Sequence, residues 1–254
     1  RNGEKYRLGC RFLEKSINLV TQTCLDFGAE KVFYLDGHGG GGNVSHENIH
    51  PSAQCCSFDE LEALLQSGSI DCVIELGSHA RAGTIGGFLD HTVSSKKWFS
   101  HRVNGIEMSE LSMHALLFGA YGVPIAACIG DEAASVQAKE YIPEIVTGAV
   151  KSAKTRNLAN PYENTDEIIV DTVLQILENG KACLPCHDGK GDCNNYEEDS
   201  NNLVLLLEVG HCAFAHIARN LLHTVVALVG LLHVEEELSG KCQRDDGSKR
   251  HYPE

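Results

Sequence analysis

The chain has 254 residues, of which 43% are apolar, so it can bury a sizeable core as one large domain or as one domain with an appendage. Its formal net charge of -14 argues against a nucleic-acid partner, because contacts with phosphates need clustered Lys and Arg. The longest apolar stretch, Leu221 to Val234, contains two histidines and is shorter than the roughly 20 residues of a membrane-spanning helix. We therefore expect a soluble, acidic, cytoplasmic protein without nucleic-acid or membrane partners.

The chain contains eleven cysteines, a number that in a small secreted protein would suggest disulfides. Most of them lie singly within apolar runs, as Cys24, Cys72 and Cys128 do, where a reduced cysteine behaves as a small hydrophobic residue. We expect these cysteines to be free thiols in the core.

The first predicted elements are a helix and a strand. Apolar residues at helical spacing between Phe12 and Leu25 predict a helix, and Gly28 stands where its C-terminal cap would be. The β-branched and aromatic run from Lys31 to Leu35 predicts a strand, which is followed by Asp36-Gly37-His38. A histidine is thus expected at the carboxyl end of this strand.

The same pattern repeats further along the chain. Phe58 to Gln66 predicts a helix with three leucines on one face, and Ile70 to Leu76 predicts a strand buried on both sides, followed by Gly77-Ser78-His79. Strands that alternate with helices favour an α/β fold: a mostly parallel sheet with flanking helices and right-handed crossovers. His38 and His79 would then follow neighbouring strands.

A hairpin and a third helix come next. Asn104-Gly105 is the strongest short-range signal for a β-hairpin. Ser109 can cap a helix that runs to about Tyr121, with Glu110 in its first turn, where the helix dipole favours a carboxylate. Pro124 to Ile129 predicts another strand.

The second half of the chain has weaker patterns. We divide the chain into an α/β core of residues 1–155 and a C-terminal portion of residues 156–254 with a polar, cysteine-containing insertion at residues 181–202. Two helices and two strands are predicted there or just before it, at Ala133 to Tyr141, Thr165 to Leu177, Ile145 to Val150 and Leu203 to Val209.

The chemistry is expected at the strand ends, since ligands bind in an open parallel sheet outside the carboxyl ends of its strands. His38, His79 and Glu110 would form a set of two imidazoles and one carboxylate, which suits zinc and leaves positions for water and substrate. Taken singly, each of these residues is more often an ordinary polar residue of a loop or a helix terminus. The glycines from Gly39 to Gly42 lack the Gly-Lys-Ser/Thr of a phosphate loop, and no Gly-x-Ser-x-Gly nucleophile motif is present.

Several segments in one order resemble the zinc-dependent D-aminopeptidases of the dipeptide-operon type. They span about residues 4 to 155 and comprise Asp36-Gly37-His38, Gly77-Ser78-His79-Ala80-Arg81-Ala82-Gly83-Thr84, Leu89-Asp90-His91-Thr92, Val103-Asn104-Gly105 with Glu110, Tyr121-Gly122-Val123-Pro124-Ile125 and Gly130-Asp131.

The resemblance implies a function and a set of site residues. It implies hydrolysis of short peptides from the amino terminus, with D-amino acids in the substrate, by a zinc-activated water. His38, His79 and Glu110 would bind a pair of zinc ions, and His91 would be the catalytic residue. It also implies a ring-shaped homo-oligomer, a decamer. Iron in a two-histidine, one-carboxylate oxygenase site is the alternative metal, although the α/β pattern differs from the jelly roll that such a protein would need.

One departure from the family concerns the amino terminus. The family's first strand carries an Asp-x-Glu pair of further metal ligands, and nothing before the first helix of this chain can be that strand. Because the sequence begins at Arg1 without an initiator Met or a signal peptide, we expect the missing ligands upstream of this residue. The alternative is a homologue that kept the fold and lost the activity, with a structural role in an assembly.

The C-terminal portion offers a second alternative. Cys183-Leu184-Pro185-Cys186-His187 has the spacing of a c-type haem attachment site, and with Cys193 it could form a cysteine-rich zinc loop. A polar surface insertion with free thiols is the simplest interpretation.

Overall fold

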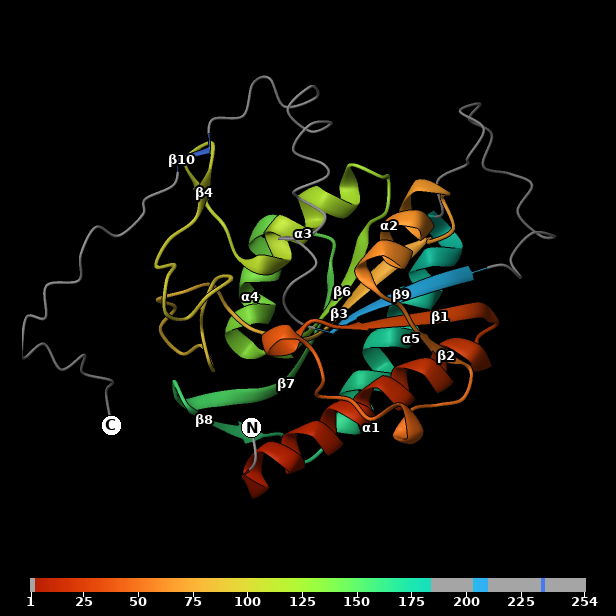
Figure 1. Ribbon diagram of the computed structural model, residues 1–254, viewed down its shortest axis with the longest axis horizontal. Coiled ribbons are helices and arrows are strands. Elements are labelled where there is room, and N and C mark those ends of the chain that lie inside the picture. Colours follow the sequence, from red (N-terminus) through yellow and green to blue (C-terminus); the bar gives the residue numbers. More distant parts are fainter. Residues whose placement is uncertain (1–2, 184–202, 210–233, 236–254) are drawn as a thin grey trace, which may run out of the picture.

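The computed structural model describes residues 3–183, 203–209 and 234–235. A seven-stranded sheet with the strand order β2-β1-β9-β3-β6-β7-β8 forms the centre of the molecule (Figure 1), and only β8 runs antiparallel to its neighbour. The prediction of an α/β fold with a mostly parallel sheet is therefore confirmed. The strands of this sheet are β1 (Ala29–Asp36), β2 (Ala53–Cys55), β3 (Cys72–Ser78), β6 (Ile125–Asp131), β7 (Val146–Thr155), β8 (Leu158–Pro161) and β9 (Leu203–Val209).

Helices cover both faces of this sheet. Helices α1 and α5 contact each other and pack on one face, and α2, α3 and α4 pack on the other (Figure 1). Each face buries its own apolar cluster: one contains Ile17, Val20, Ile169 and Val173 of α1 and α5, and the other contains residues of α2, α3 and α4. The bounds are α1 (Glu4–Asp26), α2 (Phe58–Gln66), α3 (Glu110–Gly119), α4 (Glu132–Tyr141) and α5 (Thr165–Cys183), with short 3-10 turns η1 (His38–Gly40) and η2 (His46–Asn48).

The position of β9 corrects one expectation from the sequence. His38 and His79 follow β1 and β3, which were expected to be neighbours, but β9 lies between them and pairs with both in parallel. Strand order depends on pairing between distant segments, which leaves no local pattern in the sequence. The described elements after residue 155 pack with those before it, since α5 also contacts α1. The division of the chain at residue 155 stays a prediction.

The hairpin at Asn104-Gly105 is confirmed. It joins β4 (Arg102–Val103) to β5 (Ile106–Glu107) in antiparallel pairing, and both turn residues have positive φ angles, of 53° and 77°. Positive φ at both central residues is what a type I′ turn requires, and Asn and Gly tolerate it best. The short strand β10 (Val234–Glu235) pairs with β4 to complete a second, three-stranded sheet.

Two smaller expectations can be compared with the described residues. Cys24, Cys72 and Cys128 are buried free thiols, as predicted. None of the described helices combines the length and the apolar composition that a bilayer crossing requires.

Strands β3 and β6 approach each other closely near their carboxyl ends. A Cβ atom placed on Gly130 would lie 2.2 Å from the backbone oxygen of Ser78, so no residue larger than glycine fits without movement of one strand. Because Ser78 directly precedes His79 in the chain, this contact fixes the position of His79 relative to the end of β6.

We predict that Gly130→Ala lowers the free energy of unfolding by about 1–3 kcal/mol, the usual cost of overpacking a closely packed site. The matched control is Gly119→Ala in α3, where a Cβ atom meets nothing within 4 Å. This change should leave stability the same or raise it by up to about 1 kcal/mol, because alanine favours helix. Chemical denaturation of both variants measures the difference, and equal stability would contradict the proposed close approach.

Candidate metal centre

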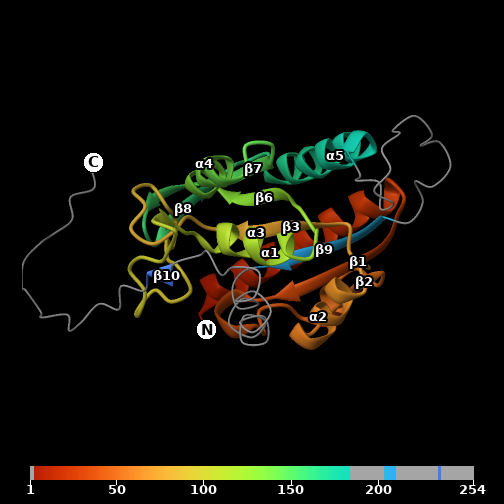
Figure 2. The same ribbon diagram turned by 90° about the horizontal axis from the view of Figure 1, so that it is seen from above.

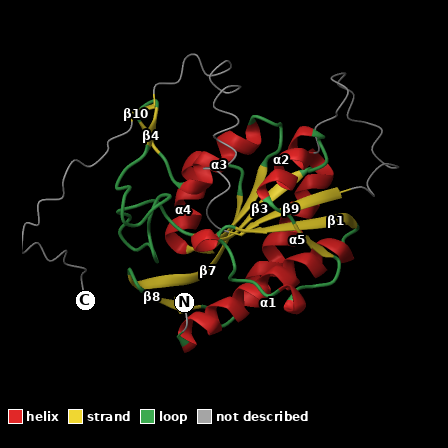
Figure 3. Cartoon of the chain, in the orientation of Figure 1, coloured by secondary structure: helices red, strands yellow, loops and turns green. Residues whose placement is uncertain are grey.

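The segment between β3 and α3 gathers the polar residues at one end of the molecule. In Figures 1 and 2 this segment, coloured yellow, lies beyond the strand ends on the left, and Figure 3 shows it as loop apart from the β4–β5 hairpin. It begins at His79 directly after β3 and ends at Ser109, the N-cap of α3. The carboxyl edge of the sheet, where the sequence predicted the site, therefore lies beneath a long loop.

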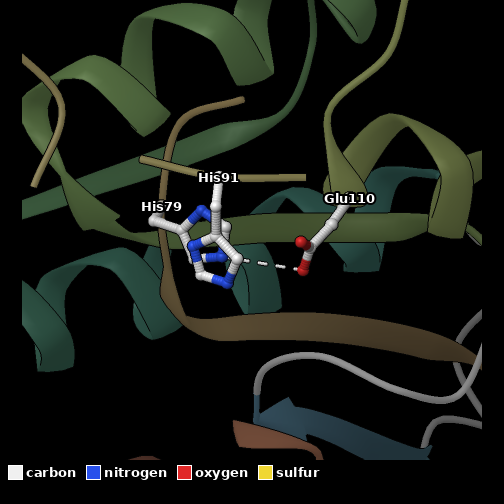
Figure 4. A group of neighbouring side chains, drawn as sticks. All are labelled: His79, His91 and Glu110. Atoms are coloured by element: carbon white, nitrogen blue, oxygen red, sulfur yellow. Dashed lines mark ion pairs between the residues drawn. The ribbon is translucent and has the colours of Figure 1, made fainter. Parts of the chain in front are cut away.

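Two side chains of this segment converge with one from the first turn of α3. One potential ligand atom from each of His79, His91 and Glu110 lies within 4.8 Å of the others (Figure 4). The imidazoles of His79 and His91 are stacked, with ring centroids 4.0 Å apart and an interplanar angle of 11°. The Nε2 atom of His79 lies 3.6 Å from Oε2 of Glu110. The arrangement offers two nitrogens and one oxygen to a common point.

Backbone carbonyls orient both imidazoles. Nδ1 of His79 lies 2.9 Å from the carbonyl oxygen of Ala80, and Nδ1 of His91 lies 2.6 Å from that of Leu89. A carbonyl oxygen only accepts, so each Nδ1 carries the proton and each Nε2 carries the lone pair. A hydrogen bond of this kind, made by the second ring nitrogen, is typical of histidines that bind metals.

Glu110 is positioned by the start of α3 and by the loop. The Ser109 side chain accepts a hydrogen bond from the backbone N–H of Ser112, which fixes the first turn of the helix. The backbone N–H of Val93 donates to Oε1 of Glu110 at 2.6 Å, while Oε2 faces His79. Val93 has a φ of 58°, an unfavourable conformation for a β-branched residue. Strain at this position is therefore coupled to the orientation of the Glu110 carboxylate.

Asp90 within the loop and Asp131 at the end of β6 hold the rest of the loop. Asp90 accepts the backbone N–H of Gly83 at 2.6 Å and forms an ion pair of 2.8 Å with Arg156, which lies after β7. Asp131, at the end of β6, is fully buried and accepts the backbone N–H groups of Phe88 and Ala134. These contacts anchor the loop residues that precede His91 to the ends of β6 and β7.

Burial keeps the imidazoles neutral. It lowers the pKa of His79, although nearby carboxylates oppose this effect. The pKa of His91 falls to about 4, first because of burial and then because of the neighbouring His79. Neutral imidazole is the form that binds a metal or accepts a proton.

The sequence-predicted residue His38 lies outside this group. Its ring contacts the backbone of Gly77 in β3, where a Cβ atom would come within 3.0 Å of Cε1. Its Nδ1 atom is buried without a hydrogen-bond partner and lies 3.8 Å from a carboxylate oxygen of Asp36. Burial lowers the pKa of His38, and the neighbouring His79 adds to this effect. The ring of His38 thus lies against β3, although β9 separates β1 from β3 within the sheet.

Sequence reasoning missed several residues that build the site. Val93 and Arg156 act through backbone and loop contacts that no short motif reveals, and the contact of Asp131 with the loop was not foreseen although its motif was recognised. A buried hydrogen bond of 2.6 Å between Nδ1 of His114 and Oε1 of Glu75 also joins α3 to β3. The apolar surroundings of Glu75 within a strand pattern were the only sequence signal for this pair.

The donor set fits a zinc ion. Zinc binds neutral imidazole nitrogen and carboxylate oxygen, and hydrolytic sites use three protein ligands with an open position. The fold and the cluster thus define an α/β protein with a potential metal centre at the carboxyl edge of its sheet.

Comparisons with known proteins identify the family. The sequence model that describes the D-aminopeptidase family, peptidase M55, matches residues 1–190. The chain belongs to this family, and the resemblance found in the sequence is confirmed.

Two relatives show how far the similarity extends. A D-aminopeptidase of Bacillus subtilis (strain 168) is 30% identical over 160 residues, which make up 62% of this chain and 57% of that protein. The solved structure of the Zn-dependent D-aminopeptidase DppA from Bacillus subtilis, described as a self-compartmentalizing protease, is similar with a TM-score of 0.62 at 25% identity. That similarity covers 68% of this chain and 65% of that one. The chain thus spans about six tenths of the length of these relatives.

We predict that Asp131→Asn loosens the loop. The amide oxygen can still cap α4, but the amide nitrogen would face the N–H group of Phe88, which leaves two donors opposed in a buried place. The free energy of unfolding should fall by about 1–3 kcal/mol. The control is Glu132→Gln, an exposed neighbour that accepts a hydrogen bond from the Tyr162 hydroxyl and can still do so as an amide. Equal effects of the two changes in denaturation experiments would refute this role of Asp131.

Proposed function

We propose that the protein is a zinc-dependent aminopeptidase that removes the amino-terminal residue, a D-amino acid, from short peptides. The observation that carries this proposal is the convergence of His79, His91 and Glu110 at the carboxyl edge of the sheet. Membership of the D-aminopeptidase family supports the substrate class. We further propose that each chain binds two zinc ions and that the protein is cytoplasmic.

In this proposal Nε2 of His79 and the Oε2 atom of Glu110 bind zinc. His38 is the third ligand from this chain, and the buried Nδ1 atom without a hydrogen-bond partner supports that role. When bound, zinc supplies a Lewis acid that polarises a peptide carbonyl and makes water a nucleophile near neutral pH.

His91 is the proposed catalytic residue. Its ring lies parallel to that of His79, and its Nδ1 proton is held by the carbonyl oxygen of Leu89. Nε2 of His91 can therefore accept a proton from the attacking water and deliver it to the leaving amine. The Oε1 atom of Glu110, held by the N–H group of Val93, keeps the carboxylate in its orientation during this transfer.

Iron and haem are weaker alternatives. A parallel sheet flanked by helices differs from the jelly roll expected for an iron oxygenase. The proposed haem or zinc motif at Cys183 to His187 extends outside the described residues. Metal analysis of the purified protein separates these alternatives from zinc at the cluster.

His79→Ala should remove bound zinc and reduce hydrolysis of a D-amino-acid dipeptide to background, because it deletes one ligand of the site. His91→Gln should keep the zinc content of the parent and lose turnover, since glutamine cannot exchange the proton. Zinc content is measured by elemental analysis and hydrolysis by product release.

The matched control is His50→Ala, a histidine whose ring contacts Gln22 of α1. It should retain zinc and activity. Loss of zinc from His91→Gln would contradict the catalytic role and make His91 a ligand. Full activity of a metal-free preparation would contradict the whole proposal.

We also propose a ring-shaped homo-oligomer, a decamer. The support is the self-compartmentalizing character given for the structural relative. Sedimentation of the purified full chain should give a single large species, and a monomer at micromolar concentration would contradict this part of the proposal.

A further inference from the structure

Lys151 is a partly buried cation beside the site that the proposed hydrolysis does not yet use. It lies in β7 in register with Asp131, and the pairing with β6 shifts by one residue just before this point. Such a bulge redirects the side chains that follow it. The ammonium of Lys151 lies 5.4 Å from the centroid of the Phe88 ring, in the loop that carries His91. Its charged end is thus beneath that loop rather than in open solvent.

In the part of the chain that the structure describes, Lys151 forms no ion pair with a carboxylate. Asp131 attracts the ammonium, but both oxygens of this carboxylate already accept backbone N–H groups. Burial lowers the pKa of Lys151, which is the sign of a charge that has lost water without gaining a close partner.

Lys151 lies at the same edge of the sheet as the candidate metal centre. It is in register with Asp131 of β6, and the preceding residue of β6, Gly130, is in register with Ser78 of β3, which directly precedes His79. Its ammonium lies over the ring of Phe88, three residues before His91 in the same loop. A substrate bound at the cluster would be within the field of this cation.

We propose that Lys151 binds an anionic oxygen of the peptide substrate. This inference rests on the proposed aminopeptidase function and specifies how that site recognises its substrate. The oxygen has two sources in such a reaction: the carboxylate terminus of a short peptide, or the oxyanion that develops at the attacked carbonyl. Either would give the ammonium a close anionic partner, which the described residues do not provide.

The test compares Lys151→Met with the parent on two substrates, D-alanyl-D-alanine, which has a carboxylate, and D-alaninamide, which has none. If Lys151 binds the carboxylate, KM for the dipeptide rises about tenfold or more and kinetics with the amide stay unchanged. If it binds the oxyanion, kcat falls about tenfold or more for both substrates. Lys151→Arg, which keeps the charge, should restore part of the loss.

The control is Lys154→Met, an exposed lysine three residues along the same strand, which should behave as the parent. Two results would overturn the proposal. One is that Lys151→Met matches the parent in kcat and KM for both substrates. The other is that it loses zinc and that arginine restores nothing, because Lys151 would then only support the loop.

A binding measurement separates this proposal from the proposed function. Calorimetry of the zinc-loaded protein with D-alanyl-D-alanine and with its C-terminal amide requires no turnover. If the parent hydrolyses neither substrate, the proposed function fails, yet weaker peptide binding by Lys151→Met still supports the lysine site. Identical binding by Lys151→Met and the parent for both peptides would then overturn it.

Discussion

The site depends on carboxylates that accept backbone N–H groups of one long loop. Asp90 holds Gly83, Asp131 holds Phe88 and Glu110 holds Val93. A loop that lies over a sheet cannot satisfy its amide groups with regular pairing, so side chains must do it. Because these carboxylates come from the loop itself, from the end of β6 and from the start of α3, they fix the loop to the rigid part of the fold.

This constraint also explains why the candidate ligands are ready for a metal. The same contacts that hold the loop bring His91 over His79, and backbone carbonyls fix the proton on Nδ1 of each ring. One oxygen of the Glu110 carboxylate accepts the N–H group of Val93, and the other faces His79. Donors that are already in place lose little conformational entropy when an ion binds. The cost of this arrangement is the strained backbone conformation of Val93.

Features with local signals could be predicted from the sequence. The Asn104-Gly105 turn and the start of α3 at Ser109 follow from turn and capping preferences, and the alternation of helices and strands gave the α/β class. The order of the strands could not be predicted, because β9 reaches its place beside β1 and β3 only after the chain has passed through α5. His91 was assigned a role by resemblance, but the contacts that hold its loop, from Asp131 to Phe88 and from Arg156 to Asp90, join distant segments and leave no local pattern in the sequence. Lys151 was missed for the same reason.

The central claim is that His79 and Glu110 bind zinc at the carboxyl edge of the sheet. Anomalous X-ray scattering at the zinc edge from crystals of the zinc-loaded protein tests it most directly. If His79 and Glu110 bind zinc, an anomalous peak is expected about 2.0–2.2 Å from Nε2 of His79 and from Oε2 of Glu110. Zinc bound only elsewhere, or no ordered zinc in protein that is active, would contradict it.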